Sequence, residues 1–118
     1  MGDVSKNFSR GEFACKCGCG FAAVDVELLQ ILEDVRERFD SSVKINSGCR
    51  CAEHNKRVGG DRDSEHMRGI AADIVVDGVP AGTVHAYLTK KFPGKYGIGK
   101  YQNWTHIDVR LRAARWSK

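Results

Sequence analysis

The sequence of 118 residues has no apolar run as long as the roughly 18 residues that a helix needs to cross a bilayer. We therefore expect no insertion into a membrane. The first residues, Met1-Gly2-Asp3-Val4-Ser5-Lys6, lack the apolar segment of a secretory signal, so we expect synthesis in the cytoplasm without a signal peptide. Internal repeats, low-complexity stretches and linkers are also missing. At this length the chain is expected to form a single domain, residues 1–118, around one hydrophobic core.

The sequence also lacks a large excess of positive or negative charge, because its 19 Lys and Arg residues and 15 Asp and Glu residues give a net charge of only +4. Cations gather in the last residues, 110–118, beside Trp116. Such a tail is compatible with a nucleic-acid-binding domain, but only charge and the number of cysteines favour that class. A solvated terminal segment with Trp116 packed on the core is the simpler interpretation, and we expect no nucleic-acid partner.

Hydrophobic periodicity predicts an α+β domain. Apolar residues recur at helical spacing over residues 25–39 and again over residues 80–92, which predicts two amphipathic helices. A brief helix is expected over residues 51–58, where Gly59-Gly60 would end it. Strands are predicted for residues 43–45, 70–76, 96–99 and 105–110. Together these elements predict a small antiparallel sheet with flanking helices.

The residues with the clearest chemistry lie in two stretches, Ser64-Glu65-His66-Met67-Arg68-Gly69-Ile70-Ala71-Ala72-Asp73 and Trp104-Thr105-His106-Ile107-Asp108. Asp73 lies in an apolar run that predicts a buried strand, where a carboxylate is rare unless it is paired or bound to a metal. His106 and Asp108 share one face of the second strand, because strand side chains alternate. Two imidazoles and a carboxylate are typical of catalytic zinc, which keeps an open position for water, whereas structural zinc is closed by four ligands. Any one of these residues alone is more simply a solvated or hydrogen-bonded side chain, but together they are candidate metal ligands.

Several motifs resemble one known family. The pattern Ser-x-His-x-x-Gly-x-Ala-x-Asp, from Ser64 to Asp73, is similar to the signature of the zinc D-Ala-D-Ala carboxypeptidases and murein endopeptidases, whose fold is shared with Hedgehog signalling domains. Ile45-Asn46-Ser47-Gly48-Cys49-Arg50-Cys51 resembles the family's Ser-Gly-Tyr-Arg stretch, with a cysteine in place of the aromatic residue. Gly97-Ile98-Gly99 and Trp104-x-His106-x-Asp108 resemble the strand pair that closes the site. Phe8-Ser9-Arg10-x-Glu12-Phe13 resembles the start of a phage and prophage branch, so the resemblance covers nearly the whole chain.

The resemblance implies a Hedgehog/DD-peptidase-like fold with Zn²⁺ bound by His66, Asp73 and His106. Arg50 would face the substrate carboxylate or the developing oxyanion, for which a planar and permanently charged guanidinium is suited. Without the resemblance, a surface ion pair would be the simpler role for Arg50. Ser64 would orient the site by hydrogen bonding, as groups behind metal ligands do.

The implied activity is metal-assisted hydrolysis of peptide bonds in peptidoglycan stem peptides or cross-links. The partner would then be a peptidoglycan peptide, and we expect a monomer. Without a signal peptide, the protein would reach the cell wall after release from the cytoplasm, as a phage or prophage lysis protein does.

The general base is less well defined. Several relatives carry an acid three residues before the last histidine, but Asn103 stands there, and an amide does not take a proton from water at neutral pH. Asp108 is the main candidate for the base, and its alternative role is to hold a ligand or Arg50. Glu65, beside His66, is a second candidate. A chain without a working base would be a degenerate, non-catalytic murein-binding module of the same fold.

The sequence contains five cysteines, an odd number, so disulfide pairing would leave at least one thiol free. Cys15, Cys17 and Cys19 lie close together, and Cys49 and Cys51 flank Arg50. Disulfides do not persist in a reducing cytosol, and Cys-x-Cys is tighter than the usual Cys-x-x-Cys of zinc fingers. Disulfides between the two groups, a second and structural zinc ion, and packed free thiols all remain open.

Overall fold

The computed structural model describes residues 4–20, 22, 24–60 and 64–117. Its longest helix, α1 (Val26–Phe39), begins after Asp25, whose carboxylate accepts hydrogen bonds from the backbone N–H groups of Glu27 and Leu28. Such a cap satisfies N–H groups that have no partner within the helix. The apolar stripe of α1 is buried, as the periodicity predicted, and consists of Leu28, Leu29, Ile31, Leu32 and Val35.

Five strands form one sheet in the order β1-β2-β4-β3-β5. They are β1 (Val43–Ser47), β2 (Ala71–Val76), β3 (Gly97–Lys100), β4 (Thr105–Asp108) and β5 (Ala114–Ser117). The pairs β1–β2, β2–β4 and β3–β4 are antiparallel, whereas β3 and β5 are parallel. The α+β class is therefore confirmed, but the sheet is mixed rather than wholly antiparallel. The difference arises because part of the C-terminal segment forms β5. This strand pairs with the edge of β3 opposite β4, where the backbone N–H and C=O groups of β3 need hydrogen-bond partners.

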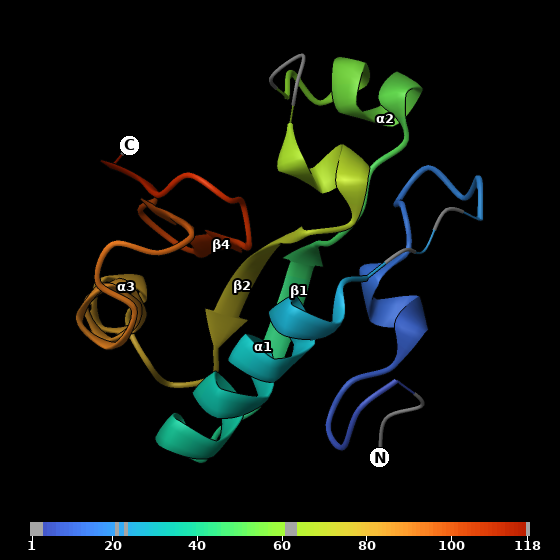
Figure 1. Ribbon diagram of the computed structural model, residues 1–118. Coiled ribbons are helices and arrows are strands. Elements are labelled where there is room, and N and C mark those ends of the chain that lie inside the picture. The colour runs from blue at the N-terminus through green and yellow to red at the C-terminus, as the bar shows by residue number, and fades with distance from the viewer. Residues whose placement is uncertain (1–3, 21, 23, 61–63, 118) are drawn as a thin grey trace.

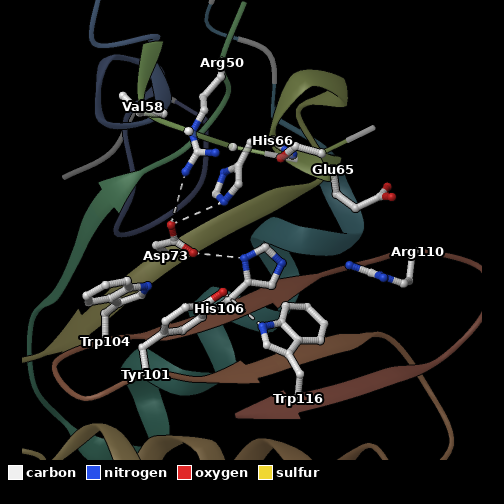
Figure 2. Close-up of a pocket in the computed structure, with 13 residues that line it drawn as sticks. Arg50, Val58, Glu65, His66, Asp73, Tyr101, Trp104, His106, Arg110 and Trp116 are labelled. Carbon is white, nitrogen blue, oxygen red and sulfur yellow. Dashed lines mark hydrogen bonds and ion pairs between the residues drawn. The ribbon is translucent and has the colours of Figure 1, made fainter. Parts of the chain in front are cut away.

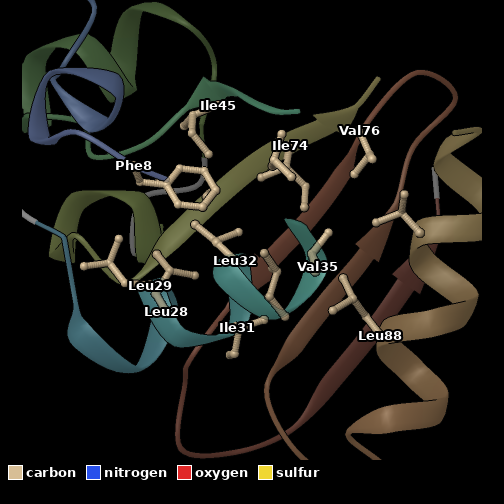
Figure 3. Packing of buried hydrophobic residues seen from close by; sticks show 14 of the residues in the cluster. Phe8, Leu28, Leu29, Ile31, Leu32, Val35, Ile45, Ile74, Val76 and Leu88 are labelled. Carbon is tan, nitrogen blue, oxygen red and sulfur yellow. The ribbon is translucent and has the colours of Figure 1, made fainter. Parts of the chain in front are cut away.

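The two faces of the sheet differ in chemistry because side chains alternate along each strand. One face carries Asp73 of β2 and His106 of β4, which are drawn in Figure 2. The alternate residues of β2, β3 and β4 point to the opposite face of the sheet. There they form part of the hydrophobic core with residues of α1 and α3 (Ala81–Lys91) (Figure 3). They include Ala72, Ile74 and Val76 of β2, Ile98 of β3 and Ile107 of β4. The helices therefore support the sheet from behind the candidate site.

The connection between β1 and β2 carries α2 (Ala52–Arg57) and the 3-10 helix η2 (Glu65–Arg68), and both lie beyond one end of the sheet (Figure 1). The N-terminal segment contains the 3-10 helix η1 (Arg10–Phe13), and its Phe8 and Phe13 are part of the core. The backbone N–H of Cys49 donates to the carbonyl of Phe13 at 2.9 Å, which joins this segment to the loop after β1. In the described part of the chain, every helix is too short or too polar to span a bilayer.

Candidate metal centre and active-site pocket

The site is built on one row of cross-strand neighbours. The register pairs Ser47 with Asp73 and Asp73 with His106, and continues from His106 to Gly99 and from Gly99 to Trp116. Cross-strand partners lie on the same face of a sheet. Each of the five strands therefore contributes one residue to a single line across this face.

His66 reaches the same point from η2. The side chain of Ser64 accepts a hydrogen bond from the backbone N–H of His66 at 3.2 Å and so caps η2. The imidazole Nδ1 of His66 lies 2.6 Å from the carbonyl oxygen of Gly48, and its Nε2 lies 3.4 Å from Oδ2 of Asp73. Ser64 therefore makes a hydrogen bond of the kind expected, and its partner is the backbone of His66 rather than the imidazole.

The side chains of His66, Asp73 and His106 converge, with one ligand atom of each within 4.8 Å of the others. His106 Nδ1 lies 2.9 Å from Oδ1 of Asp73, while His106 Nε2 lies 2.7 Å from Oδ2 of Asp108. The outer nitrogens, Nδ1 of His66 and Nε2 of His106, therefore face oxygen acceptors and can donate their protons to them. The inner nitrogens can then present lone pairs to a common cation, an arrangement typical of metal-binding histidines. This donor set fits a zinc ion with three protein ligands.

Asp73 and His106 change each other's pKa. Burial alone would raise the pKa of Asp73, but hydrogen bonds with His106 and His66 hold that pKa well below its ordinary value. Burial alone would lower the pKa of His106, but the carboxylates of Asp108 and Asp73 raise it above its ordinary value. Asp73 is therefore ionised, and a cation that binds here competes with a proton on His106. Metal binding is expected to release that proton.

Asp108 lies behind His106 and is fully buried, with 0% of its surface exposed. Its Oδ1 accepts hydrogen bonds from Gly97 N at 3.1 Å and from Arg110 N and Nε at 3.1 and 2.8 Å. Its Oδ2 accepts from Arg110 Nη2 at 2.7 Å and faces His106 Nε2. A Cβ on Gly97 would collide with this carboxylate, so glycine leaves the space that Asp108 fills. Both oxygens are engaged, which favours the second role considered for Asp108, holding a metal ligand, over proton abstraction from water.

Arg50 points toward Asp73 from the loop after β1 (Figure 2). Its Nη2 lies 3.6 Å from Oδ2 of Asp73, its Nε donates to Ser47 Oγ at 3.2 Å, and its Nη1 donates to Asn55 Oδ1 at 3.1 Å. Asn55 is buried and helps to orient Arg50. Sequence reasoning did not identify this role, because an asparagine in a short polar helix has the pattern of a surface residue.

A pocket of about 770 Å³ opens over these residues. Aromatic rings form one of its sides: Tyr101 and Trp104 stack with ring centroids 4.7 Å apart, and the ring of Trp116 lies 5.0 Å from that of His106. Trp116 also donates from Nε1 to the hydroxyl of Tyr101 at 3.0 Å. A Cβ on Gly99 would collide with the Trp116 ring, so this glycine allows the ring to lie there.

Trp116 was expected to pack on the core within a solvated tail, and it lines the pocket instead. Apolar and polar residues alternate over residues 114–117, and this pattern could have predicted the strand that carries Trp116.

A family model described as Peptidase M15 matches residues 6–108, a span that includes the converging His-Asp-His group and Arg50. The chain belongs to the peptidase M15 family. Peptidases of this family use zinc, so the match indicates a zinc-dependent metallopeptidase and agrees with the group that could bind a metal. No curated protein sequence matches the chain well enough to count as a relative.

In this M15 peptidase a second acidic residue, Glu65, lines the pocket together with Asp73. In Figure 2 its carboxylate points away from Asp73, toward the side of the pocket on which Arg110 is drawn. Its Oε2 is buried and, within the described residues, has no hydrogen-bond partner, although Arg68 Nη1 lies 3.7 Å away. Asn103, which stands three residues before His106, is exposed and does not belong to the described residues that line the pocket.

The M15 peptidase also carries a cluster of sulfur atoms that could bind a metal, formed by Cys15, Cys17, Cys19 and Cys51. Cys49 is separate from this cluster, since its thiol donates to the carbonyl oxygen of Phe13 at 3.0 Å.

Proposed function

We propose that this M15 peptidase hydrolyses peptide bonds of peptidoglycan, either as a D-Ala-D-Ala carboxypeptidase or as a murein endopeptidase. The observation that carries the proposal is the convergence of His66, Asp73 and His106 in the wall of an open pocket, with Arg50 next to them. Two histidines and one aspartate leave room for water or substrate on the ion, as in catalytic zinc sites.

His66, Asp73 and His106 would hold the zinc ion, which when bound supplies an electrophile that lowers the pKa of water and polarises a carbonyl. Asp108 fixes the orientation of the His106 ring through its contact with Nε2. Glu65, the other acid that lines the pocket, is our candidate for the group that takes a proton from water and delivers it to the leaving amine once its side chain turns toward the ion. The aromatic side chains beside His106 form one side of the pocket and would contact a bound substrate.

The environment of Arg50 supports the proposal that the substrate is an anionic peptide. Its side chain is 14% exposed and is held by Ser47 and Asn55, so the guanidinium is fixed in direction before a substrate arrives. A guanidinium binds carboxylates through parallel hydrogen bonds. A peptide that ends in D-Ala-D-Ala places a free carboxylate one residue from the scissile bond, close enough for a group beside the metal ligands to bind it.

The protein would act as a monomer on the cell wall after release from the cytoplasm. The resemblance of residues 8–13 to the start of a phage and prophage branch supports this proposal. Its Phe8 and Phe13 are core residues, so the segment is part of the folded domain.

Digestion of defined muropeptides followed by mass spectrometry tests the proposed function. We expect the zinc-loaded protein to remove a terminal D-alanine or to split a cross-linked dimer, and the fragment masses identify the bond. A zinc-loaded protein that sediments with purified murein but leaves every muropeptide mass unchanged would contradict the proposal in favour of a non-catalytic murein-binding module.

Replacing Asp108 by Asn tests the role of this residue. Because an amide cannot hold the His106 N–H as a carboxylate does, zinc affinity is expected to fall by about 10- to 100-fold, and excess zinc should restore most of the activity. Zinc affinity is measured by competition with a chelating dye, and Asp77→Asn, at an exposed acid outside the pocket, is the matched control. Unchanged zinc affinity with a kcat lowered by about 10²- to 10⁴-fold would instead make Asp108 the general base.

A further inference from the structure

A second set of potential ligands lies outside the peptidase site. The sulfur atoms of Cys15 and Cys17 are 3.4 Å apart, those of Cys15 and Cys51 are 3.8 Å apart, and those of Cys17 and Cys51 are 3.6 Å apart. With Cys19 included, the four sulfur atoms all lie within 4.8 Å of one another. They come from two segments that are distant in the sequence.

These separations match the geometry of a zinc–thiolate site. A zinc ion binds thiolate sulfur at about 2.3 Å, and the edges of a tetrahedron with that radius are about 3.8 Å long. The short spacing of Cys15, Cys17 and Cys19 is compatible with this geometry because the backbone turns sharply between them. Gly18 has a φ of 84° and donates its N–H to the carbonyl of Cys15 at 3.2 Å, which folds the segment back on itself.

Backbone N–H groups are directed at two of the sulfur atoms. The N–H of Cys51 lies 3.4 Å from the sulfur of Cys15, and the N–H of His54 lies 3.4 Å from the sulfur of Cys51. Donors in these positions stabilise the thiolate form, which is the form that binds metals.

The two alternatives for these cysteines fit less well. Each of Cys15, Cys17 and Cys51 contacts the other two, which selects no single pair for a disulfide, and none of these three sulfur atoms is bonded to another in the structure. Thiols packed as small apolar side chains would be buried, yet Cys19 is exposed and Cys17 and Cys51 are only partly buried. Cys49 shows what the packed alternative looks like, with 1% of its surface exposed.

We propose that Cys15, Cys17, Cys19 and Cys51 bind a second zinc ion with a structural role. Four thiolates close the coordination sphere, so this ion has no position for substrate or water. Binding energy at such a site contributes directly to folding. The ion joins the N-terminal segment to Cys51, the residue that follows Arg50, and therefore stabilises the loop that directs Arg50 toward Asp73.

Metal content tests this inference. The full-length protein, expressed in zinc-supplemented medium and purified with a reductant and without chelators, is expected to contain two zinc ions per chain by elemental analysis. Cys17→Ser is expected to contain one, while the matched control Cys49→Ser, which changes a thiol outside the cluster, retains two.

Cobalt substitution of the unaltered protein provides a measurement that does not depend on the folding of a variant. A site with four thiolates gives intense sulfur-to-cobalt charge-transfer absorption, which a site with two histidines and one aspartate does not. A protein with one zinc ion and no such absorption would overturn the inference, as would a mass that shows a disulfide among these four cysteines in the protein as purified. Failure of the peptidase proposal is a different result, since an inactive chain with two zinc ions would still support the cysteine site.

Discussion

Replacement of His66 by alanine is expected to abolish hydrolysis of muropeptides and to remove one zinc ion per chain. The remaining ligands, Asp73 and His106, would leave the ion with only two protein contacts. A bound metal contributes several kcal/mol of charge stabilisation in the transition state, so kcat/KM should fall by at least about 10³-fold. The measurements are the initial rate on a defined muropeptide and the zinc content of the same sample.

The His85→Ala variant is the matched control for this prediction. It makes the same chemical change on α3, outside both groups that could bind a metal, and should keep full activity and zinc content. Full activity together with an unchanged zinc content in His66→Ala would show that the catalytic ion is bound elsewhere, and the proposed site would have to be abandoned.

Much of the fold follows from local patterns. The helix over residues 25–39 was predicted because its apolar residues repeat at 3.6-residue spacing, and the structure has α1 at Val26–Phe39. The strand around Asp73 was predicted from an apolar run, and β2 is found at Ala71–Val76. Within such a run a carboxylate is a strong signal, because burial without a partner is so unfavourable. Local chemistry thus identified the residues that converge.

The remaining features depend on the alignment of distant segments. Alternation predicted correctly that Asp108 and His106 share a face, but not that Asp108 is covered by Arg110 and lies opposite Gly97. That environment follows from the register between β3 and β4. The position of Trp116 beside His106 likewise depends on β5 pairing with β3 in one particular register. Register is fixed by the three-dimensional packing of the sheet, and a single sequence carries little direct information about it.

Glu65→Gln is expected to lower kcat by about 10²- to 10⁴-fold while the zinc content and the KM for a muropeptide change little. The substitution keeps the size of the side chain and removes its ability to accept a proton. Among the described residues that line the pocket, Glu65 and Asp73 are the acids, and Asp73 faces the two histidines and Arg50. Glu65 is therefore the acid of the pocket lining that is left to take a proton from water, and this is the role that the substitution tests. The measurements are steady-state kinetics and elemental analysis.

The control for Glu65→Gln is Glu53→Gln, the same change at an exposed position on α2 outside the pocket, and this variant should behave as the unaltered protein. The pH dependence of kcat/KM adds a second criterion, because loss of the general base should remove the rise in rate on its acidic side. If Glu65→Gln keeps both its kcat and this rise, Glu65 only shapes the pocket, and the base must be sought at Asp108. The two substitutions therefore separate a residue that moves a proton from one that holds a metal ligand in place.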